Sequence, residues 1–262
     1  MGGDMFTKID EWKYHQLKCF IGTLPKSLRL KKEWNMFERL LETRRDGKHG
    51  VTKMYRILTE LDTDTKLIFI TNWERDMGVV IDEDQQNKIF RLIHECVSMR
   101  EVEINYKCLT RWHITPSTEH RMRGENSKMC WRGCGEEGTV FHIWWQCPKI
   151  QVFWKTIVKL IEIITGNDIG LDPTMCLLHS VETTVNKYKE SGVWYYLSAA
   201  KGLIPRFWRR IEVPTEEDWI NRVNQISRME KSYHIQEDRM KIYYLRWEKW
   251  EKSGLKEKYR KL

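Results

Sequence analysis

Apolar side chains recur at three- and four-residue intervals along most of the chain, which is the spacing of one face of an α-helix. The clearest case begins at Pro148, which suits a first helical turn, and stops at Gly166. Between them, the apolar positions that repeat with this period are Phe153, Ile157, Leu160, Ile161 and Ile164. The periodicity predicts a mainly α protein.

Polar residues mark where further helices begin. Asp82 is suited to cap a helix whose apolar face includes Ile89 and Ile93. Thr215 is followed three residues later by Asp218, which is a capping-box pattern and predicts a second helix start. The main strand candidate is TKLIFIT at 65–71, a short apolar run with β-branched residues. Because an isolated strand pair is marginal in water, this candidate leaves the fold class unchanged.

Three cysteines and one histidine fall within eighteen residues, CWRGCGEEGTVFHIWWQC at 130–147. Their spacing is C-x3-C-x7-H-x4-C, which gives two pairs of ligands on two short turns, as in structural zinc sites. The predicted ligands are Cys130, Cys134, His142 and Cys147, and the predicted cofactor is zinc. We expect Gly133, Gly135 and Gly138 to supply positive φ angles in the turns. Four ligands leave no open position, so the predicted role is structural.

The alternative is that these cysteines are small core residues and that His142 is a hydrogen-bonded core histidine. The other four cysteines, Cys19, Cys96, Cys108 and Cys176, have no partner at ligand spacing and are predicted to be buried thiols. A hydrolase with His142 and a cysteine nucleophile is a weaker alternative, because a closed zinc site would consume the thiolates.

The least periodic stretch of the chain is TPSTEHRMRGENSK at 115–128, just before the cysteine cluster. We therefore expect three parts: a helical region over residues 1–117, a zinc-knuckle module over 118–150 and a second helical region over 151–262. In this interpretation, helical bundle segments flank a small zinc-knuckle module.

Aromatic and basic residues crowd the same module. Exposed aromatic rings stack on bases, and Lys or Arg beside them neutralise phosphates, so the combination is typical of single-stranded nucleic-acid binding. The predicted contact residues are Arg121, Arg123, Lys128, Trp131, Arg132, Trp144 and Trp145. The alternative for each tryptophan is that it fills the space between the knuckle and the helix that follows.

The charge distribution also favours a polyanionic partner. The chain has a formal net charge of +8, and basic residues gather in residues 26–48 and 239–262 on either side of an acidic middle. Clustered Lys and Arg bind phosphates with release of counterions, which makes RNA or DNA the expected partner. The alternative is that these residues are the solvated faces of helices.

No run approaches the roughly 18 consecutive apolar residues of a membrane span, so we expect no membrane partner. Seven cysteines are an odd number and most are scattered, which argues against a secreted disulfide framework. We expect an intracellular protein, in the nucleus or the cytoplasm.

Two runs, YKCLTRWHITPSTEHRM at 106–122 and CWRGCGEEGTVFHIWWQCPKIQVFW at 130–154, resemble the C-terminal region of a LINE-type non-LTR retrotransposon reverse transcriptase. The likeness extends over nearly the whole chain, including AAKGLIPRFWRR at 199–210. Two departures stand out. His113 replaces a usual tyrosine, and Pro205 lies inside a normally continuous helix, which it should kink or break.

The resemblance implies thumb-adjacent helices with a zinc knuckle that grips element RNA or target DNA, beside the polymerase core of the parent protein. The polymerase palm with its paired aspartates and the endonuclease are absent from this sequence. Asp62, Asp64 and the run at 82–84 lie in polar turns instead of the setting that two-metal chemistry needs. We therefore expect a transposon-derived fragment that is not itself an enzyme. The competing interpretation is a zinc-stapled structural or protein-interaction module without a nucleic-acid role.

Overall fold

The computed structural model describes residues 67–94, 98–124, 127–180 and 192–258, together with Gln16, Cys19, Phe20 and Thr23. The chain divides into two compact units, residues 1–65 and 66–262. The basic segment predicted at 26–48 lies outside the described residues. The helices and the site below belong to the second unit.

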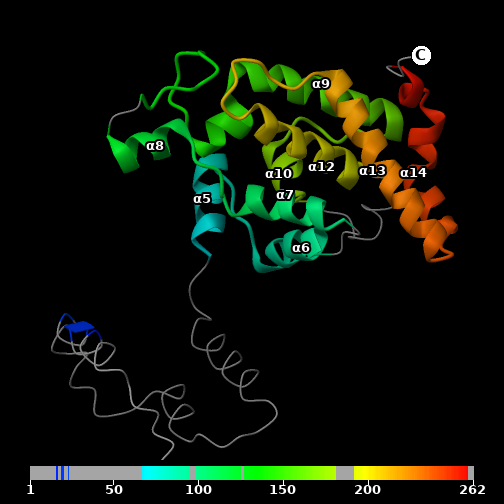
Figure 1. Cartoon of the computed structure of the whole chain (residues 1–262), viewed down its shortest axis with the longest axis horizontal. Coiled ribbons are helices and arrows are strands. Elements are labelled where there is room, and N and C mark those ends of the chain that lie inside the picture. Colours follow the sequence, from blue (N-terminus) through cyan, green and yellow to red (C-terminus); the bar gives the residue numbers. More distant parts are fainter. Residues whose placement is uncertain are drawn as a thin grey trace, which may run out of the picture. The chain divides into compact units, whose positions relative to one another are not determined.

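The described part of the second unit is built from helices (Figure 1). Within these residues there is no named strand, and the only β-type pairing found is an isolated antiparallel bridge between Met129 and Glu137. The mainly α prediction is confirmed. In chain order the elements are α5 (Ile68–Met77), α6 (Glu83–His94), α7 (Met99–Leu109), α8 (Pro116–Arg123), η1 (His142–Gln146), α9 (Pro148–Thr165), α10 (Pro173–Leu178), α12 (Val193–Leu203), η2 (Ile204–Phe207), α13 (Glu216–Gln236), α14 (Met240–Lys252) and η3 (Leu255–Glu257).

The predicted helix starts are confirmed. Asp82 Oδ1 accepts a hydrogen bond of 2.7 Å from the backbone N–H of Gln85, and Gln85 Oε1 accepts one from the N–H of Asp82. At the start of α13, Thr215 and Asp218 form the reciprocal bonds of a capping box. α9 begins at Pro148 and ends before Gly166, whose φ of 70° is the left-handed cap that glycine adopts without strain.

The strand predicted at 65–71 is wrong, because its described residues enter α5. Ile70 and Trp73 are fully buried, and their three-residue spacing places both on one helical face. The indole Nε1 of Trp73 donates to the carbonyl oxygen of Leu109 at 2.8 Å, which ties α5 to the end of α7. Burial of this face outweighs the strand propensity of the LIFI run.

α12 is the centre of the core. All eleven of its residues are buried, and it contacts α7, α9, α10 and α13. Figure 1 shows it lying between α9 and α7. Large rings pack around it: Trp219 of α13 donates from Nε1 to the backbone oxygen of Tyr196 at 3.0 Å, and Trp247 of α14 lies beside the same tyrosine.

Pro205 ends α12. The α-helix stops at Leu203, and the chain continues as the short 3₁₀ helix η2, as expected where proline removes a backbone donor. Past this break the chain turns toward the segment that precedes α8, where the indole of Trp208 donates to the carbonyl of Ile114 at 2.6 Å. The predicted helix break is therefore confirmed.

Among the helices of the described residues, none combines the length and the apolar content that a membrane crossing requires.

Candidate metal centre and adjoining aromatic groove

The four predicted ligands lie together. One ligand atom from each of Cys130, Cys134, His142 and Cys147 falls in a group whose members are all within 4.8 Å of one another. Cys134 Sγ is 3.2 Å from His142 Nε2, and the sulfurs of Cys130 and Cys147 are 4.0 Å apart. Zinc bound at about 2.3 Å to sulfur and about 2.0 Å to nitrogen would set ligands roughly 3.5–3.8 Å apart in a tetrahedron. These four side chains can therefore hold one metal ion.

The first pair of ligands is carried by a tight loop. Gly133 and Gly135 have φ angles of 69° and 85°, which only glycine adopts readily, so their predicted role is confirmed. The backbone N–H of Cys130 donates to Glu136 O at 2.8 Å, and the N–H of Gly133 donates to Cys130 O at 3.0 Å. The loop thus folds back on itself and presents Cys130 and Cys134 to the same point.

Gly138 acts differently from the prediction. It has no positive φ among the glycines of the described chain, and a Cβ there would collide with the ring of Pro116 at the start of α8. Its N–H and C=O pair with Lys128 and Ser117 respectively. Gly138 is needed for close approach, because it lets the loop lie against α8.

The second pair of ligands is carried by a turn of π-helix, η1. The backbone N–H of Cys147 donates to His142 O at 2.9 Å, a bond that spans five residues. In an α-helix, residues five apart point roughly 140° away from each other. The wider π turn instead brings His142 and Cys147 to one side, and such turns are often found at functional sites.

The electrostatics of the four groups suit a bound cation. Burial and the neighbouring thiols Cys147 and Cys134 raise the pKa of Cys130 to about 12. Burial also opposes ionisation of Cys147, but the pKa of that thiol is lowered, because the backbone N–H groups of Ile150 and Lys149 and the charge of Arg132 stabilise its thiolate. Burial lowers the pKa of His142, which favours the neutral imidazole that a metal needs.

The burial and charge of Arg132 indicate whether a metal ion suits this site. Its side chain is completely buried, Nη1 donates to Ile143 O at 2.8 Å, and Nε and Nη2 have no hydrogen-bond partner in the described residues. A buried guanidinium without an anion is costly. Three thiolates and a neutral imidazole around a divalent cation carry one net negative charge, so Arg132 supplies the opposite charge. The donor set and the position of this buried cation beside the Cys147 thiol both fit a metal with thiolate ligands.

The predicted nucleic-acid residues divide into two groups. Arg121, Arg123 and Lys128 are exposed, and Trp131 is partly exposed. Arg123 and Lys128 have only long ion pairs, at 3.6 Å to Glu119 and 3.7 Å to Glu137. All four side chains are accessible from solvent.

Placing Arg132, Trp144 and Trp145 on this surface was wrong, because all three are buried. Trp144 has no exposed surface and lies 5.4 Å, ring to ring, from Trp208. Trp145 packs on Trp154, whose Nε1 donates to Trp144 O at 2.8 Å. The π turn directs both rings inward, so they join the knuckle to α9.

A groove of about 460 Å³ adjoins the knuckle, and we call it the aromatic groove. Its lining residues come from two distant segments and are Trp112, His113, Ile114, Trp208 and Arg209. Trp112 is 68% exposed, which is unusual for so large a ring.

Trp131 connects the aromatic groove to the knuckle. The guanidinium of Arg209 lies 5.2 Å above the Trp131 ring, and Trp208 meets the same ring edge to face at 6.5 Å. The cation and these rings therefore form one continuous surface beside the metal ligands.

The backbone conformation of Arg111 determines that the next side chain, Trp112, points to solvent. Arg111 has a φ of 56°, uncommon for a residue with a side chain. Its guanidinium stacks 4.2 Å over the ring of Trp73 and forms an ion pair with Asp76 of α5. Because Arg111 is held inward, the following tryptophan projects to solvent. Strain of this kind at a surface aromatic is typical of functional sites.

Sequence reasoning missed Trp112, Trp208 and Arg209 as site residues. Residues 112–114 and 208–209 are more than 90 positions apart, and they meet only because Pro205 ends α12. The available signal was the unusual RW pair at 111–112, which ends three residues before the Thr115 cap of α8.

The remaining cysteines lie away from this site. Cys108 and Cys176 are buried, as predicted, and burial raises their pKa values to about 11 and about 12. Cys19 is exposed, so its predicted burial was wrong. Cys96 lies outside the described residues.

Compared with known protein families, the chain matches no family model.

Proposed function

We propose that this protein binds single-stranded nucleic acid as the C-terminal region of a LINE-type reverse transcriptase, with zinc as a structural ion in its knuckle. One observation carries the proposal: an exposed aromatic groove with an arginine adjoins the metal ligands. Exposed tryptophan beside cationic side chains is the combination that stacks bases and neutralises phosphates together.

Zinc has a structural role in this proposal. The Cys130, Cys134, His142 and Cys147 side chains fill a tetrahedral shell, so the ion fixes the loop and leaves no position for substrate. By holding the loop, it fixes Trp131 beside Trp208 and Arg209. The chain's own residues then make the contacts with the strand.

The strand is held by stacking and by charge. Bases stack on Trp112 and Trp208, a contact worth about 1–3 kcal/mol per base by alanine substitution. Arg209 lies at one side of the aromatic groove, and Arg121, Arg123 and Lys128 are exposed on α8 and the knuckle loop that follows it. These four cations neutralise phosphates, so the affinity falls as salt rises.

The origin from a retrotransposon polymerase is supported by the motif residues at 106–122 and 130–154. Their chemistry agrees with the geometry: the CWRGC run supplies two ligands and the buried Arg132, and the HIWWQC run supplies the π turn. In this proposal the partner of the described helices is the polymerase core of a parent protein. The proposal assigns no nucleotide-transfer activity to this chain itself.

The test measures zinc content and strand affinity in one series. The purified chain should hold one zinc, and it should bind a labelled single-stranded RNA or DNA oligonucleotide with an affinity that drops steeply between low and high salt. Trp112→Ala should weaken binding roughly 5- to 100-fold, which corresponds to about 1–3 kcal/mol. Tyr244→Ala on α14, 53% exposed in the native chain, is the matched control.

A Cys130→Ser, Cys134→Ser variant completes the series. It should lose the zinc and the strand affinity together. Without the ion the loop no longer holds Trp131 beside Trp208 and Arg209. Strand binding that survives both the loss of zinc and Trp112→Ala would sink the proposal.

A structural module is the second candidate, and the burial of Arg132, Trp144 and Trp145 favours it. In that case zinc staples the knuckle to α8 and α9, and the aromatic groove takes no strand. Zinc at one per chain without any salt-dependent binding of RNA or DNA would select this candidate.

A further inference from the structure

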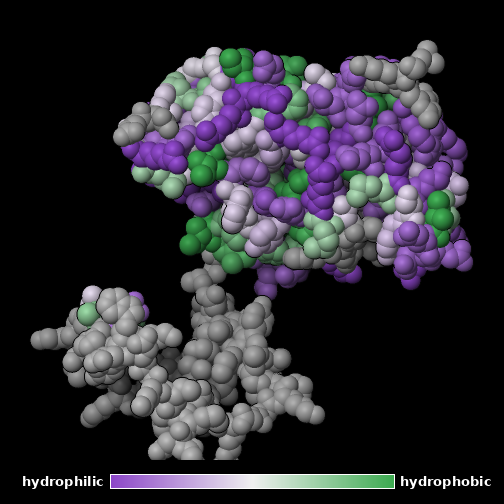
Figure 2. All heavy atoms as spheres, in the orientation of Figure 1, coloured by the Kyte–Doolittle hydropathy of each residue, from purple (hydrophilic) through white to green (hydrophobic). Residues whose placement is uncertain are grey.

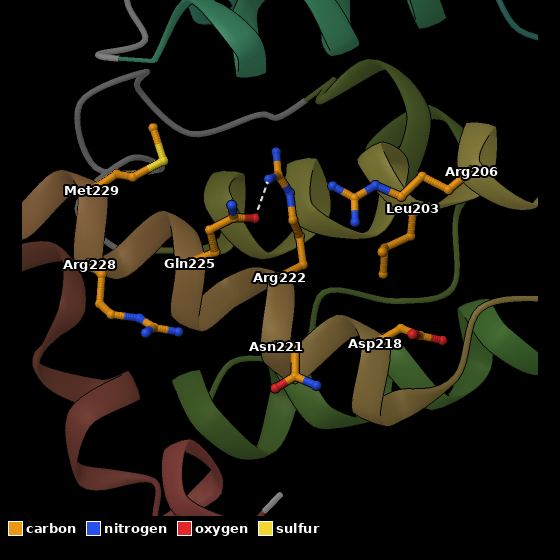
Figure 3. Close-up of a pocket in the computed structure, with 8 residues that line it drawn as sticks. All are labelled: Leu203, Arg206, Asp218, Asn221, Arg222, Gln225, Arg228 and Met229. Carbon is orange, nitrogen blue, oxygen red and sulfur yellow. Dashed lines mark hydrogen bonds between the residues drawn. The ribbon is translucent and has the colours of Figure 1, made fainter. Parts of the chain in front are cut away.

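A cleft of about 530 Å³ lies where the end of α12 and η2 meet α13 (Figure 3). It is separate from the metal ligands and from the aromatic groove. Its lining residues are Leu203, Arg206, Asp218, Asn221, Arg222, Gln225, Arg228 and Met229. Three of these residues are arginines, and we call the cleft the arginine cleft. In Figure 3 the side chains of Arg206 and Arg222 extend toward the same part of it.

Arg222 is a fixed part of this cleft. Its side chain is 1% exposed and forms an ion pair with Glu101, which is also buried. Nη1 donates to Gln225 Oε1 at 2.7 Å, while Nε has no hydrogen-bond partner in the described residues. Burial raises the pKa of the Glu101 carboxyl, and nearby positive charges lower it. These charges are those of its ion-pair partner Arg222 and of Arg100, Lys201 and Arg206.

Arg206 and Arg228 are the exposed cations of the cleft, and Nε of Arg228 donates to Asn224 O at 3.2 Å. Both side chains are exposed, and neither has an ion pair in the part of the chain that the structure describes. Burial lowers the pKa of Arg222, Glu101 raises it, and the positive charges of Arg100 and Arg206 lower it further. Arg206 therefore lies close enough to Arg222 to act on it electrostatically.

The one acidic residue lining the cleft is already engaged. Asp218 Oδ2 accepts from the backbone N–H of Thr215 at 2.9 Å and from its hydroxyl at 2.8 Å, which forms the cap of α13. The amides of Asn221 and Gln225 are on the same helix and are exposed. The cleft therefore offers several donors and no free carboxylate.

We propose that the arginine cleft is a phosphate-binding site that takes a backbone phosphate of the strand held at the aromatic groove. Arg206 and Arg228 donate N–H bonds to the phosphate oxygens, an interaction for which arginine is better suited than lysine. The buried Arg222–Glu101 pair keeps the wall of the cleft in place, and Asn221 provides a neutral donor. This inference rests on the proposed nucleic-acid function.

Connectivity supports one strand across both sites. Arg206 of η2 lines the arginine cleft, and Trp208 and Arg209, which follow η2 and line the aromatic groove, are two and three positions further along the chain. Figure 2 shows a hydrophilic band over the segment between α12 and α13 on the face that is drawn. A strand that crosses this segment can contact the aromatic groove with its bases and the arginine cleft with a phosphate.

The experiment replaces both exposed cations by neutral residues, Arg206→Gln with Arg228→Gln, and leaves the buried Arg222–Glu101 pair intact. The control removes the same charge from exposed positions on α9, Lys155→Gln with Lys159→Gln. Each chain is titrated with a single-stranded oligonucleotide at several salt concentrations and, separately, with inorganic pyrophosphate by calorimetry. Circular dichroism confirms that each variant is folded.

The expected result is specific to the cleft. The Arg206, Arg228 variant should bind the strand more weakly and lose about 1–2 from the slope of log affinity against log salt, about 1 for each phosphate contact removed. The control should keep the native slope. Trp112→Ala should lower affinity at an unchanged slope, because stacking releases no counterions.

The outcomes separate the two proposals. Strand binding that is equal in the Arg206, Arg228 variant and the control overturns the arginine cleft and leaves the aromatic groove standing. Pyrophosphate binding that the variant loses, in a chain that binds no strand, assigns the cleft to free phosphates and overturns the proposed function instead. Binding of neither ligand by the native chain overturns both.

Discussion

The knuckle at 127–147 and the helical core around α12 use the same residue types but are held together differently. In the core, tryptophans such as Trp194, Trp219 and Trp250 are completely buried against neighbouring helices. In the knuckle, regular secondary structure is limited to one isolated bridge and a short π turn. The knuckle's buried rings point outward from the ligands into α9 and the aromatic groove.

This difference separates two sources of stability. Apolar area removed from water stabilises the core, at roughly 25 cal/mol per Å². The loop of the knuckle is short and glycine-rich, and its four ligand side chains lie where a metal ion could fix it. Removal of the metal should therefore destabilise the knuckle, and a cavity made by substitution should destabilise the helical core.

Removal of the metal should have the largest local effect. Structural zinc contributes about 10–16 kcal/mol of apparent binding free energy in isolated fingers, so a strong chelator should unfold the knuckle. Hydrogen exchange should show loss of protection at Cys130–Cys147, while α12 and α13 remain protected. Protection of the knuckle that survives chelation would show that packing alone holds it.

A cavity in the core should have the next largest effect. Trp219→Ala removes a fully buried ring and its bond to Tyr196 O, which should cost about 3–5 kcal/mol of unfolding free energy. Urea unfolding measures this, with Tyr244→Ala as an exposed aromatic control. Zinc affinity of the folded variant should stay native. A change of less than about 1 kcal/mol would contradict the view of α12 as the stabilising centre.

Substitution of Arg132 should act on the metal more than on the core. Arg132→Gln removes the charge that balances the ligand cluster, and loss of such supporting groups typically costs 10–100-fold in metal affinity. Competition with a chromogenic chelator measures this, and Arg123→Gln, exposed on α8, is the control. Equal affinities in the two variants would show that Arg132 serves only its bond to Ile143 O.

A pH change should produce the smallest effect, and only in the core. Lys201 is buried, donates to Leu177 O at 3.0 Å and lies 2.6 Å from His179 Nε2. Burial lowers the pKa of Lys201 to about 8, below its value of 10.5 in an unfolded chain. The unfolded chain therefore binds more protons at this lysine between these values, so Lys201 by itself should raise the free energy of unfolding by about 1 kcal/mol from pH 8 to pH 9.

Lys201→Met is the matched control for this pH effect, because it removes the titrating group from the same buried position. The buried Cys108 and Cys176 act in the opposite direction over the same pH range, because burial raises their pKa values above 9.0, the value of an unfolded thiol. The measured quantity is therefore the difference in stability between the native chain and the variant, from urea unfolding under reducing conditions, which should grow by about 1 kcal/mol in favour of the native chain from pH 8 to pH 9. A native slope in the Lys201→Met variant would assign the effect to another group.

Local signals predicted much of the fold. Caps such as Asp82 and Thr215 act within one turn of helix, and the proline break at Pro205 acts on the backbone itself, so each could be identified from adjacent residues. The strand at 65–71 failed because burial of Ile70 and Trp73 depends on α7, which no local pattern contains.

The candidate site shows the same limit. The four ligands could be predicted because their spacing is a local property of two turns. The direction of Trp144 and Trp145 could not, because it depends on a π turn that composition does not reveal. Trp208 reaches the aromatic groove only through the tertiary fold, so its pairing with Ile114 was invisible in the sequence.

The π turn also restricts how the chain length can vary. A π turn holds one more residue than the α-helical turn it replaces. Deletion of one residue between His142 and Cys147 would place the two ligands four residues apart, a spacing that an α-helical turn also holds on one face. Insertion of one would leave Cys147 at the start of α9 but turn it away from His142, because neither an α turn nor a π turn brings residues six apart to one side. The spacer can therefore lose a residue only if the π turn becomes an α turn, and it cannot gain one without separating the ligands.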